Sequence, residues 1–328
     1  ETTRRINLGF DMQANDNRLR ITGDIFHNHT SNLLTLKQLS YLTGLDYYWC
    51  NGGAMNNTGA TLNVTNRLIS TKNWKWETGV SIGTYKNYIT QLPDGTTFKS
   101  AKDGDLYGFT TDIYGATMLS AEGHSAGVFF GYETDGVYAT AADVPTVNGE
   151  PISTQDVTTG IKTPFAAGDV KFVDQNGDNV INLQDRVIIG NPNPDIYGNI
   201  TSNLMYKNFS LSATLNYSWG NDVYNYQRSL IESGSSFYNQ TTAMTNRWRT
   251  EGDVTDVPRA TYGDPKGNNR FSDRWIEDGS YIRLKDITLS YKVPVQASWL
   301  QGLTVWCAGT NLLTLTNYLG SDPEFSFS

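Results

Sequence analysis

Phe209-Ser-Leu-Ser-Ala-Thr-Leu-Asn-Tyr-Ser-Trp219 decides the fold. Apolar or aromatic side chains alternate with Ser, Thr and Asn through the whole stretch. Successive side chains of a β-strand point to opposite faces of a sheet, so this stretch predicts a strand with one apolar and one polar face. Residues 196–206 alternate in the same way, and only Lys207-Asn208 separates the two stretches. Together they predict a tight antiparallel hairpin.

The same pattern recurs in three other parts of the chain. The alternation is interrupted by short turn-forming segments at Asn15-Asp16-Asn17 and at Thr71-Lys72-Asn73. In the last hairpin the apolar phase slips at Lys285-Asp286, which predicts a β-bulge. The eight predicted strands cover about residues 3–12, 18–27, 58–68, 74–86, 196–206, 209–219, 280–292 and 302–312.

The connections between these strands are of two kinds. Links within a hairpin are only a few residues long, whereas the links between hairpins cover about residues 28–57, 87–195 and 220–279. Outer-membrane barrels are built with tight periplasmic turns and large extracellular loops. A soluble β-sandwich rarely has three such long connections at one end. The chain is therefore predicted to be all-β, an antiparallel transmembrane β-barrel segment with three long extracellular loops.

Composition narrows the class of protein. Of the 328 residues, 38% are hydrophobic, and no stretch approaches the ~18 consecutive apolar residues of a membrane-spanning helix. The net charge of -8 and the absence of a basic cluster argue against a nucleic-acid partner. The 19 Tyr and 31 Gly suit a barrel with polar loops, but they equally suit a secreted β-sandwich. Cys50 and Cys307 lie far apart in sequence and are expected to be unpaired thiols, although a disulfide between them is left open.

Several segments carry a family resemblance. They are Gly168-Asp-Val-Lys-Phe-Val-Asp-Gln-Asn-Gly-Asp178, Ile189-Gly-Asn-Pro-Asn-Pro194, Asp278-Gly-Ser-Tyr-Ile-Arg-Leu-Lys-Asp-Ile-Thr-Leu-Ser-Tyr291 and Asp322-Pro-Glu324. In this order they resemble the SusC/RagA family of TonB-dependent outer-membrane transporters. The resemblance covers essentially the whole chain.

The resemblance implies a function that the alternation alone does not. It implies the C-terminal part of a barrel of roughly 22 strands in the outer membrane of a Gram-negative bacterium. Such a transporter would import oligosaccharides or peptides with a SusD-like surface lipoprotein as a lid, and it would contact outer-membrane lipid. The family often forms a dimer of transporter–lid pairs. Both ends of the chain look like cuts in a longer protein, so contact with TonB is expected through an N-terminal region outside this chain. The alternative is a secreted β-sandwich that binds glycan or acts as a glycoside hydrolase.

One segment has the spacing of a calcium-binding loop. Oxygen-bearing groups recur at the ligand positions of an EF-hand loop, but Asn179 replaces the usual Gly and an Asp replaces the final Glu. The alternative is an Asx-rich turn held by bonds from its own side chains to the backbone. No cofactor is expected to be required, and a calcium ion is the one ligand that the sequence suggests. The predicted ligands are Asp174, Asn176, Asp178, Val180 (through its carbonyl), Asn182 and Asp185.

No catalytic motif is present, so the chain is not expected to be an enzyme. Neither a GxSxG nor an HExxH pattern occurs. Aromatic residues in the predicted loops are candidates for contact with a substrate or with the lid, because aromatic faces stack on sugar rings. They could instead pack the loops together. These residues are Trp219, Tyr224, Tyr226, Phe237, Tyr238, Trp248 and Trp275.

Overall fold

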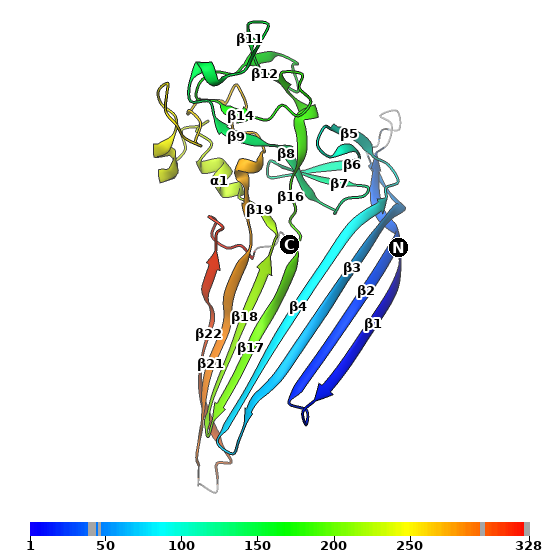
Figure 1. Cartoon of the computed structure of the whole chain (residues 1–328), viewed down its shortest axis with the longest axis vertical. Helices are drawn as coiled ribbons and strands as arrows, with labels where there is room; N and C mark the ends of the chain where they lie inside the picture. The colour runs from blue at the N-terminus through cyan, green and yellow to red at the C-terminus, as the bar shows by residue number, and fades with distance from the viewer. Residues whose placement is uncertain (39–43, 45–46, 296–298, 325–328) are drawn as a thin grey trace.

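The computed structural model describes residues 1–38, 44, 47–295 and 299–324, and its main feature is one long antiparallel sheet (Figure 1). We call this eight-stranded sheet the wall. Its spatial order is β1-β2-β3-β4-β17-β18-β21-β22. The strands are β1 (Thr2–Ala14), β2 (Leu19–Gln38), β3 (Tyr47–Ser70), β4 (Trp74–Gln91), β17 (Ile196–Tyr206), β18 (Phe209–Trp219), β21 (Tyr281–Val293) and β22 (Leu303–Thr316).

Each predicted strand corresponds to one strand of the wall, but one predicted loop is wrong. Most of residues 28–57 continue β2 and β3, which stay paired as far as Gln38 and Tyr47. In this segment Leu and aromatic residues are interspersed irregularly with Asn, Thr and Gly, so no sustained apolar alternation marks it. Backbone pairing does not need an apolar face, and periodicity therefore missed it. Parts of the 28–57 loop and of the 295–300 turn, together with residues 325–328, lie outside the described residues.

The turns and the bulge follow from local chemistry. Asn15, Asp16 and Asn17 all have φ between 54° and 61°, a left-handed conformation that Asn and Asp tolerate better than most residues. The predicted bulge is present: Asp286 pairs with Thr214 and Leu284 with Leu215, so Lys285 has no partner on β18. The extra residue explains why the apolar phase slips in this strand.

At the end of the wall opposite the short turns lies a compact region that we call the cap, residues 92–195 and 220–280 (Figure 1). Its largest sheet has the order β16-β8-β7-β6-β5, and smaller sheets pair β9 with β14, β10 with β11, β12 with β13 and β15, and β19 with β20. The strands are β5 (Thr96–Ser100), β6 (Gly104–Ile113), β7 (Ala116–Ala121), β8 (Val128–Tyr132), β9 (Thr134–Val137), β10 (Thr146–Val147), β11 (Glu150–Pro151), β12 (Ser153–Gln155), β13 (Lys162–Pro164), β14 (Val170–Phe172), β15 (Val180–Ile181), β16 (Arg186–Gly190), β19 (Asp222–Tyr224) and β20 (Ile276–Asp278). Helix α1 spans Tyr226–Ile231, and short 3-10 helices span Ala141–Asp143, Leu183–Asp185, Thr242–Asn246 and Asp273–Trp275.

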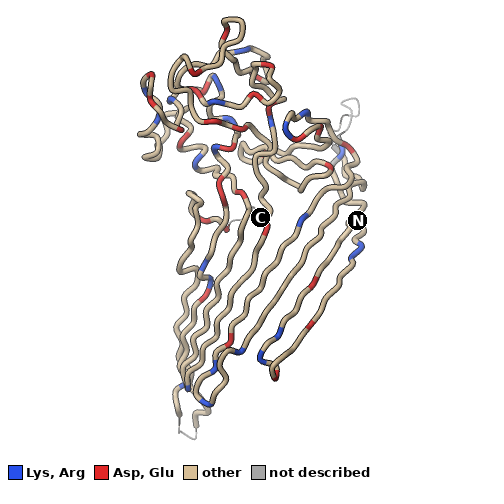
Figure 2. The backbone as a smooth tube through the Cα atoms, viewed as in Figure 1, with Lys and Arg blue, Asp and Glu red and all other residues tan. Residues whose placement is uncertain are grey.

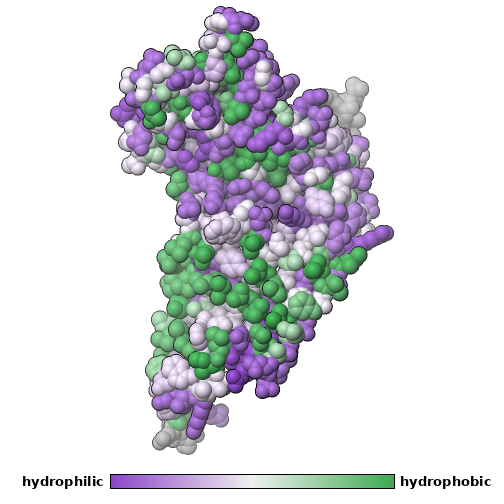
Figure 3. All heavy atoms as spheres, in the orientation of Figure 1, coloured by the Kyte–Doolittle hydropathy of each residue, from purple (hydrophilic) through white to green (hydrophobic). Residues whose placement is uncertain are grey.

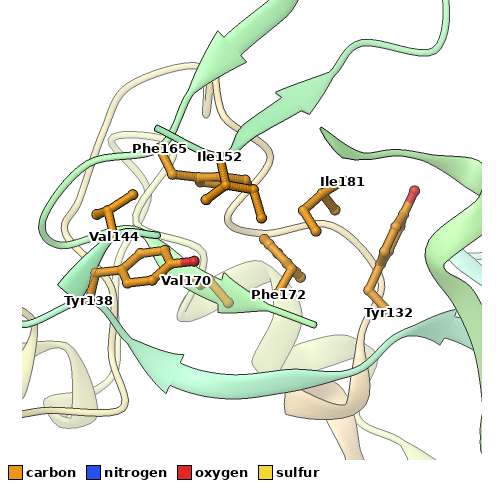
Figure 4. Close-up of a cluster of buried hydrophobic side chains, with 8 residues drawn as sticks. All are labelled: Tyr132, Tyr138, Val144, Ile152, Phe165, Val170, Phe172 and Ile181. Carbon is orange, nitrogen blue, oxygen red and sulfur yellow. The ribbon is translucent and has the colours of Figure 1, made fainter. Parts of the chain in front are cut away.

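The hydrophobic core lies in the cap, not in the wall. One cluster packs Tyr138, Phe165, Phe172 and their neighbours (Figure 4). A second cluster surrounds Leu119 and Phe130 in the five-stranded sheet. The regions predicted as long loops are therefore folded units with cores of their own. Among the described residues, no helix is long and apolar enough to cross a membrane.

Candidate functional site

The wall has one apolar and one polar face, in register across all of its strands. Residues paired directly across antiparallel strands point to the same face, so a row can be followed from β1 to β22. One row is apolar in every strand: Met12, Ile21, Val64, Val80, Ile200, Leu215, Leu284 and Leu313. The next row is polar in every strand: Asp11, Thr22, Asn63, Ser81, Asn199, Asn216, Arg283 and Thr314.

No other described residues cover the apolar face of the wall, and its large side chains are exposed. Leu8 is 75% exposed and Leu313 is 55% exposed. Hydrophobic side chains gather over the lower part of the wall, whereas hydrophilic ones dominate the cap (Figure 3). Charged residues are sparse along the middle of the strands and frequent in the cap (Figure 2). An exposed apolar patch of this extent marks a surface that contacts lipid or another protein. The β-sandwich alternative is wrong in this respect, because no other sheet of the described residues covers Phe209 and Leu211, which stay exposed.

Aromatic rings line the turn end of the apolar face. Trp74, Tyr206, Phe209 and Tyr291 form one continuous cross-strand row. The ring centroids are 4.2 Å apart for Trp74 and Tyr206, and 4.5 Å apart for Phe209 and Tyr291. Rings with a polar edge are favoured at the boundary between hydrocarbon and water, so this row is placed where an interfacial girdle would lie.

On the polar face, one buried arginine joins two sequence motifs. Arg283 is in β21, and its guanidinium is almost completely buried. It forms ion pairs with Asp322 and with Glu324, the latter at 2.8 Å. Sequence reasoning did not identify this contact, although both partners lie in motifs that carry the family resemblance. The ion pairs hold the segment after β22 against the polar face of the wall.

The predicted calcium ligands lie together in the cap, but their oxygens bind the backbone. The carboxylate of Asp174 accepts bonds from the N–H groups of Gly177 and Asn179, both at 2.7 Å. Asp185 is fully buried and accepts bonds from the N–H groups of Gln175 at 3.0 Å and Asn182 at 2.7 Å. Burial raises the pKa of Asp185.

The other side-chain oxygens of the loop also accept hydrogen bonds from backbone N–H groups. Asn176 accepts a bond from the N–H of Asp178, and Asp178 accepts one from the N–H of Val180. Asn182 accepts one from the N–H of Gln184, and Asn179 has φ 64°, the left-handed conformation that position 6 requires. Within the described residues, no group of three or more His, Cys, Asp and Glu side chains is arranged to hold a metal ion. The geometry is that of an Asx-rich turn, and the calcium ion stays a prediction.

The seven candidate loop aromatics divide into buried and exposed groups. Trp275 is 1% exposed, so it packs inside the cap and presents no face to a substrate. Trp248 donates from its indole Nε1 to the carbonyl of Ala139 at 3.0 Å, and the Tyr224 hydroxyl donates to the carbonyl of Tyr114 at 3.2 Å. Tyr226 is partly covered by Tyr114, at 5.1 Å between ring centroids. The exposed aromatics are Trp219, Phe237 and Tyr238, and Tyr226 is just above a third exposed, at 37%.

The exposed aromatics of the cap include one that the sequence did not single out. Phe237 is 91% exposed and stacks on Tyr262, with 5.0 Å between ring centroids and 27° between planes. Tyr262 is itself exposed, as is Tyr238 next to Phe237. Tyr262 is the residue that the sequence did not single out, because it lies in an irregular segment without a periodic pattern.

Cys50 and Cys307 are both free thiols.

The sequence is similar to those of known TonB-dependent receptors. The chain is 32% identical to TonB-dependent receptor P3 of Formosa agariphila over 331 residues, which covers all of this chain and 31% of that protein. It is 26% identical to TonB-dependent receptor SusC of Bacteroides thetaiotaomicron, covering 99% of this chain and 30% of that protein. The chain thus spans about a third of the length of these relatives. No protein-family model matches it.

Solved structures share the fold. The RagAB peptide importer in its closed-closed state superposes with a TM-score of 0.75 at 23% identity, covering 98% of this chain and 33% of that one. In its open-open state the TM-score is 0.73. None of these relatives is named as an enzyme, in agreement with the expectation from sequence. The predicted resemblance is confirmed: along its whole length the chain is similar to TonB-dependent receptors of the SusC and RagA type.

Proposed function

We propose that the chain forms part of the barrel wall of an outer-membrane importer in a Gram-negative bacterium. The observation that carries this proposal is the pair of adjacent rows, one apolar and one polar in all eight strands. In hydrocarbon every backbone polar group must bond within the protein, which strands of a closed barrel achieve. The apolar row would face lipid, and the polar row would face an enclosed lumen.

The two edges of the wall support closure by further strands. Within the described residues, β1 and β22 each have a wall neighbour on one side only. An edge strand left open in a membrane has unpaired N–H and C=O groups, so a barrel must continue beyond both edges. A barrel of roughly 22 strands, as the resemblance implies, would supply the missing neighbours.

Substrate and energy source are proposed from the relatives. The similar proteins are named TonB-dependent receptors, and the structural neighbour is described as a peptide importer. We propose that the whole protein imports oligosaccharides or peptides into the periplasm. Contact with TonB would be made by a region outside this chain. The protein would work with a SusD-like lipoprotein, as a dimer of transporter–lid pairs.

The lid would cover the exposed aromatics of the cap. Phe237, Tyr238 and Tyr262 form an apolar surface that no other described residue covers. The cap lies beyond the end of the wall that is opposite the turns, where an extracellular partner would approach (Figure 1). Aromatic residues are enriched at the centres of protein interfaces. This surface is therefore the proposed contact with the lipoprotein lid.

Membrane fractionation tests the wall assignment. The full-length protein should be recovered in the outer-membrane fraction and should stay in solution only with detergent. Deletion of its gene should abolish growth on the imported nutrient while leaving growth on glucose unchanged. Recovery of the protein in the soluble fraction without detergent would overturn the assignment.

Co-purification with the co-expressed SusD-like lipoprotein tests the lid contact separately. Replacing Phe237, Tyr238 and Tyr262 together by Ser should reduce the recovered lipoprotein several-fold, because hot-spot aromatics dominate such interfaces. The matched control is Val147→Ser, which removes an exposed apolar side chain from another part of the cap. Equal recovery with both variants would show that the lid binds elsewhere.

A further inference from the structure

The cap contains a cavity whose walls combine arginines with aromatic rings. It has a volume of about 390 Å³ and lies between the β12–β13 hairpin, the first residue of β16 and residues 264–271. Arg186 and Arg270 line it together with Phe130, Tyr132 and Phe271. Cavities of this size accept small solutes, and a few placed polar groups determine which ones.

Within the part of the chain that the structure describes, the Arg186 guanidinium makes no hydrogen bond and no ion pair. Arg186 is the first residue of β16, and its guanidinium carbon lies 4.9 Å from the centre of the Phe130 ring. Its Nε atom is buried and makes no hydrogen bond to any described residue. No carboxylate of the described residues lies within ion-pair distance of this guanidinium. A guanidinium has five N–H donors, so most of the hydrogen-bonding capacity of Arg186 is unused.

Arg270 is held firmly by its neighbours, and no carboxylate of the described residues forms an ion pair with it. Its guanidinium lies between the rings of Tyr132 and Phe172, at 5.0 and 4.6 Å from their centres. It donates to the Thr154 hydroxyl at 2.6 Å, and to the backbone carbonyls of Lys266 and Gly267. All these acceptors are neutral, so they fix the orientation of the guanidinium without cancelling its charge.

The acidic groups near the two arginines act on them only at longer range, Asp112 on Arg186 and both Asp264 and Asp185 on Arg270. Most of these carboxylates already accept hydrogen bonds from other groups. One oxygen of Asp156 accepts bonds from the N–H groups of Thr158 and Thr159, and the oxygens of Asp264 accept from those of Asn268 and Asn269. Asp185 also accepts hydrogen bonds from backbone N–H groups. The remaining lysine is already neutralised, because Lys266 pairs with buried Asp169 at 3.0 Å.

We propose that this cavity binds a small solute through a carboxylate group, with Arg186 and Arg270 as the cationic ligands and the aromatic rings around its body. Burial lowers the pKa of both guanidinium groups, so their charged forms are destabilised in the free protein. A bound carboxylate supplies the missing negative charge and can accept two parallel N–H bonds from one guanidinium. The carboxylate can come from a sugar acid or from an acidic amino acid. The proposal does not depend on the import function, because it concerns binding alone.

Calorimetric titration of the full-length protein in detergent tests it. The probes are galacturonate, N-acetylaspartate, inorganic sulfate and neutral galactose. At least one carboxylate probe should bind about tenfold or more tightly than galactose, since a hydrogen bond to a charged group contributes about 1.5–3 kcal/mol. Tighter binding of galacturonate identifies a sugar acid as the source, and tighter binding of N-acetylaspartate identifies an acidic amino acid. Preference for sulfate over both carboxylates, or equal binding of all four probes, overturns the proposal.

The variant Arg186→Met separates binding from folding. Methionine keeps the apolar contact with Phe130 but removes the charge. Carboxylate affinity should fall about tenfold or more, whereas the melting temperature without ligand should not fall, because Arg186 makes no hydrogen bond that the variant would lose. The matched control Lys72→Met removes a positive charge from a turn at the far end of the wall and should leave affinity unchanged. A lower melting temperature with unchanged affinity would make Arg186 a structural residue only.

Discussion

The hydroxyl of Tyr217 donates a hydrogen bond of 2.9 Å to the backbone carbonyl of Ser81, two strands away in the wall. Tyr217 is in β18 and Ser81 is in β4, and the ring crosses β17 at Gly198, its cross-strand partner. Glycine has no Cβ, so the ring can lie directly over the strand. A phenol on the apolar face needs a hydrogen-bond partner in the protein, and Ser81 supplies it.

Replacing Gly198 by Ala should therefore destabilise the wall. A Cβ there would overlap the carbonyl oxygen of Ser81 and lie 2.7 Å from the Tyr217 hydroxyl oxygen. We expect the free energy of unfolding in lipid vesicles to fall by about 1–3 kcal/mol, as for other overpacked sites. Tyr217→Phe removes only the hydrogen bond and should cost about 0.5–1.5 kcal/mol. Urea titration measures both, and an Ala variant as stable as the wild type would disprove this account of Gly198.

A new charge should destabilise the protein on the apolar face of β18 and should be tolerated on its polar face. Leu211 is in the apolar face and Ser212 is in the polar face, since Leu211 pairs with Leu289 and Ser212 with Thr288. If the apolar face meets lipid, Leu211→Arg should destabilise the wall, by less than the about 2–4 kcal/mol of a midplane position because Leu211 lies two residues from the aromatic row at Phe209. Ser212→Arg should be tolerated, because its side chain would point into water. The amount of each variant in the outer membrane gives the answer, and equal amounts would contradict the assignment of the two faces.

The sequence predicted the wall better than the cap, for a physical reason. Alternation in residues 209–219 is imposed by two different environments on the two faces, so hydropathy alone locates that strand. In residues 28–38, the pairing of β2 with β3 continues without such a contrast, and the prediction failed there. The phase slip at Lys285 was visible because it shifts apolar residues from one face to the other.

The cap and its contacts depend on pairings between distant segments. Arg270 meets Tyr132 only because the end of β8 pairs with the backbone at Ser272, far away in the sequence, and no local pattern encodes this. The spacing of the Asp174–Asp185 loop was visible in the sequence, but the sequence did not show where each oxygen points. A carboxylate can bind backbone N–H groups or a cation with the same spacing, and only coordinates distinguish the two in a given state.

Substitution of Asp185 tests both the stability of the Asp174–Asp185 loop and the binding of the predicted calcium ion. Asn in its place keeps one acceptor oxygen but turns an NH₂ group toward a backbone N–H, which leaves a buried donor unsatisfied. We expect Asp185→Asn to reduce the free energy of unfolding of the cap by about 1–3 kcal/mol without calcium. The exposed control Asp105→Asn, whose partner Lys99 is 3.9 Å away, should have almost no effect.

Calcium itself is tested by the melting temperature of the same variants. If the loop binds the ion, calcium should raise the melting temperature of the wild type, and EDTA should reverse the increase, because a ligand that binds only the folded state stabilises it. The increase should be absent in Asp185→Asn and retained in Asp105→Asn. A wild-type melting temperature that does not change with calcium would leave the loop as an Asx-rich turn.

The ion pair between Lys102 and Glu133 predicts how the cap responds to acid. The ammonium of Lys102 lies 3.0 and 3.2 Å from the two oxygens of Glu133, and Gln175 donates to the same carboxylate at 2.9 Å. These bonds lower the pKa of Glu133 below its ordinary 4.5, with the bond from Lys102 as the largest cause. The resulting stability is complete above pH 4.5 and is lost as the pH falls through the lowered value. Both side chains are more than a third exposed, so we expect at most about 1 kcal/mol, less in high salt. Thermal melts from pH 6 to pH 3 should show a smaller loss for Glu133→Gln than for the wild type, and parallel curves would exclude this pair as a source of acid sensitivity.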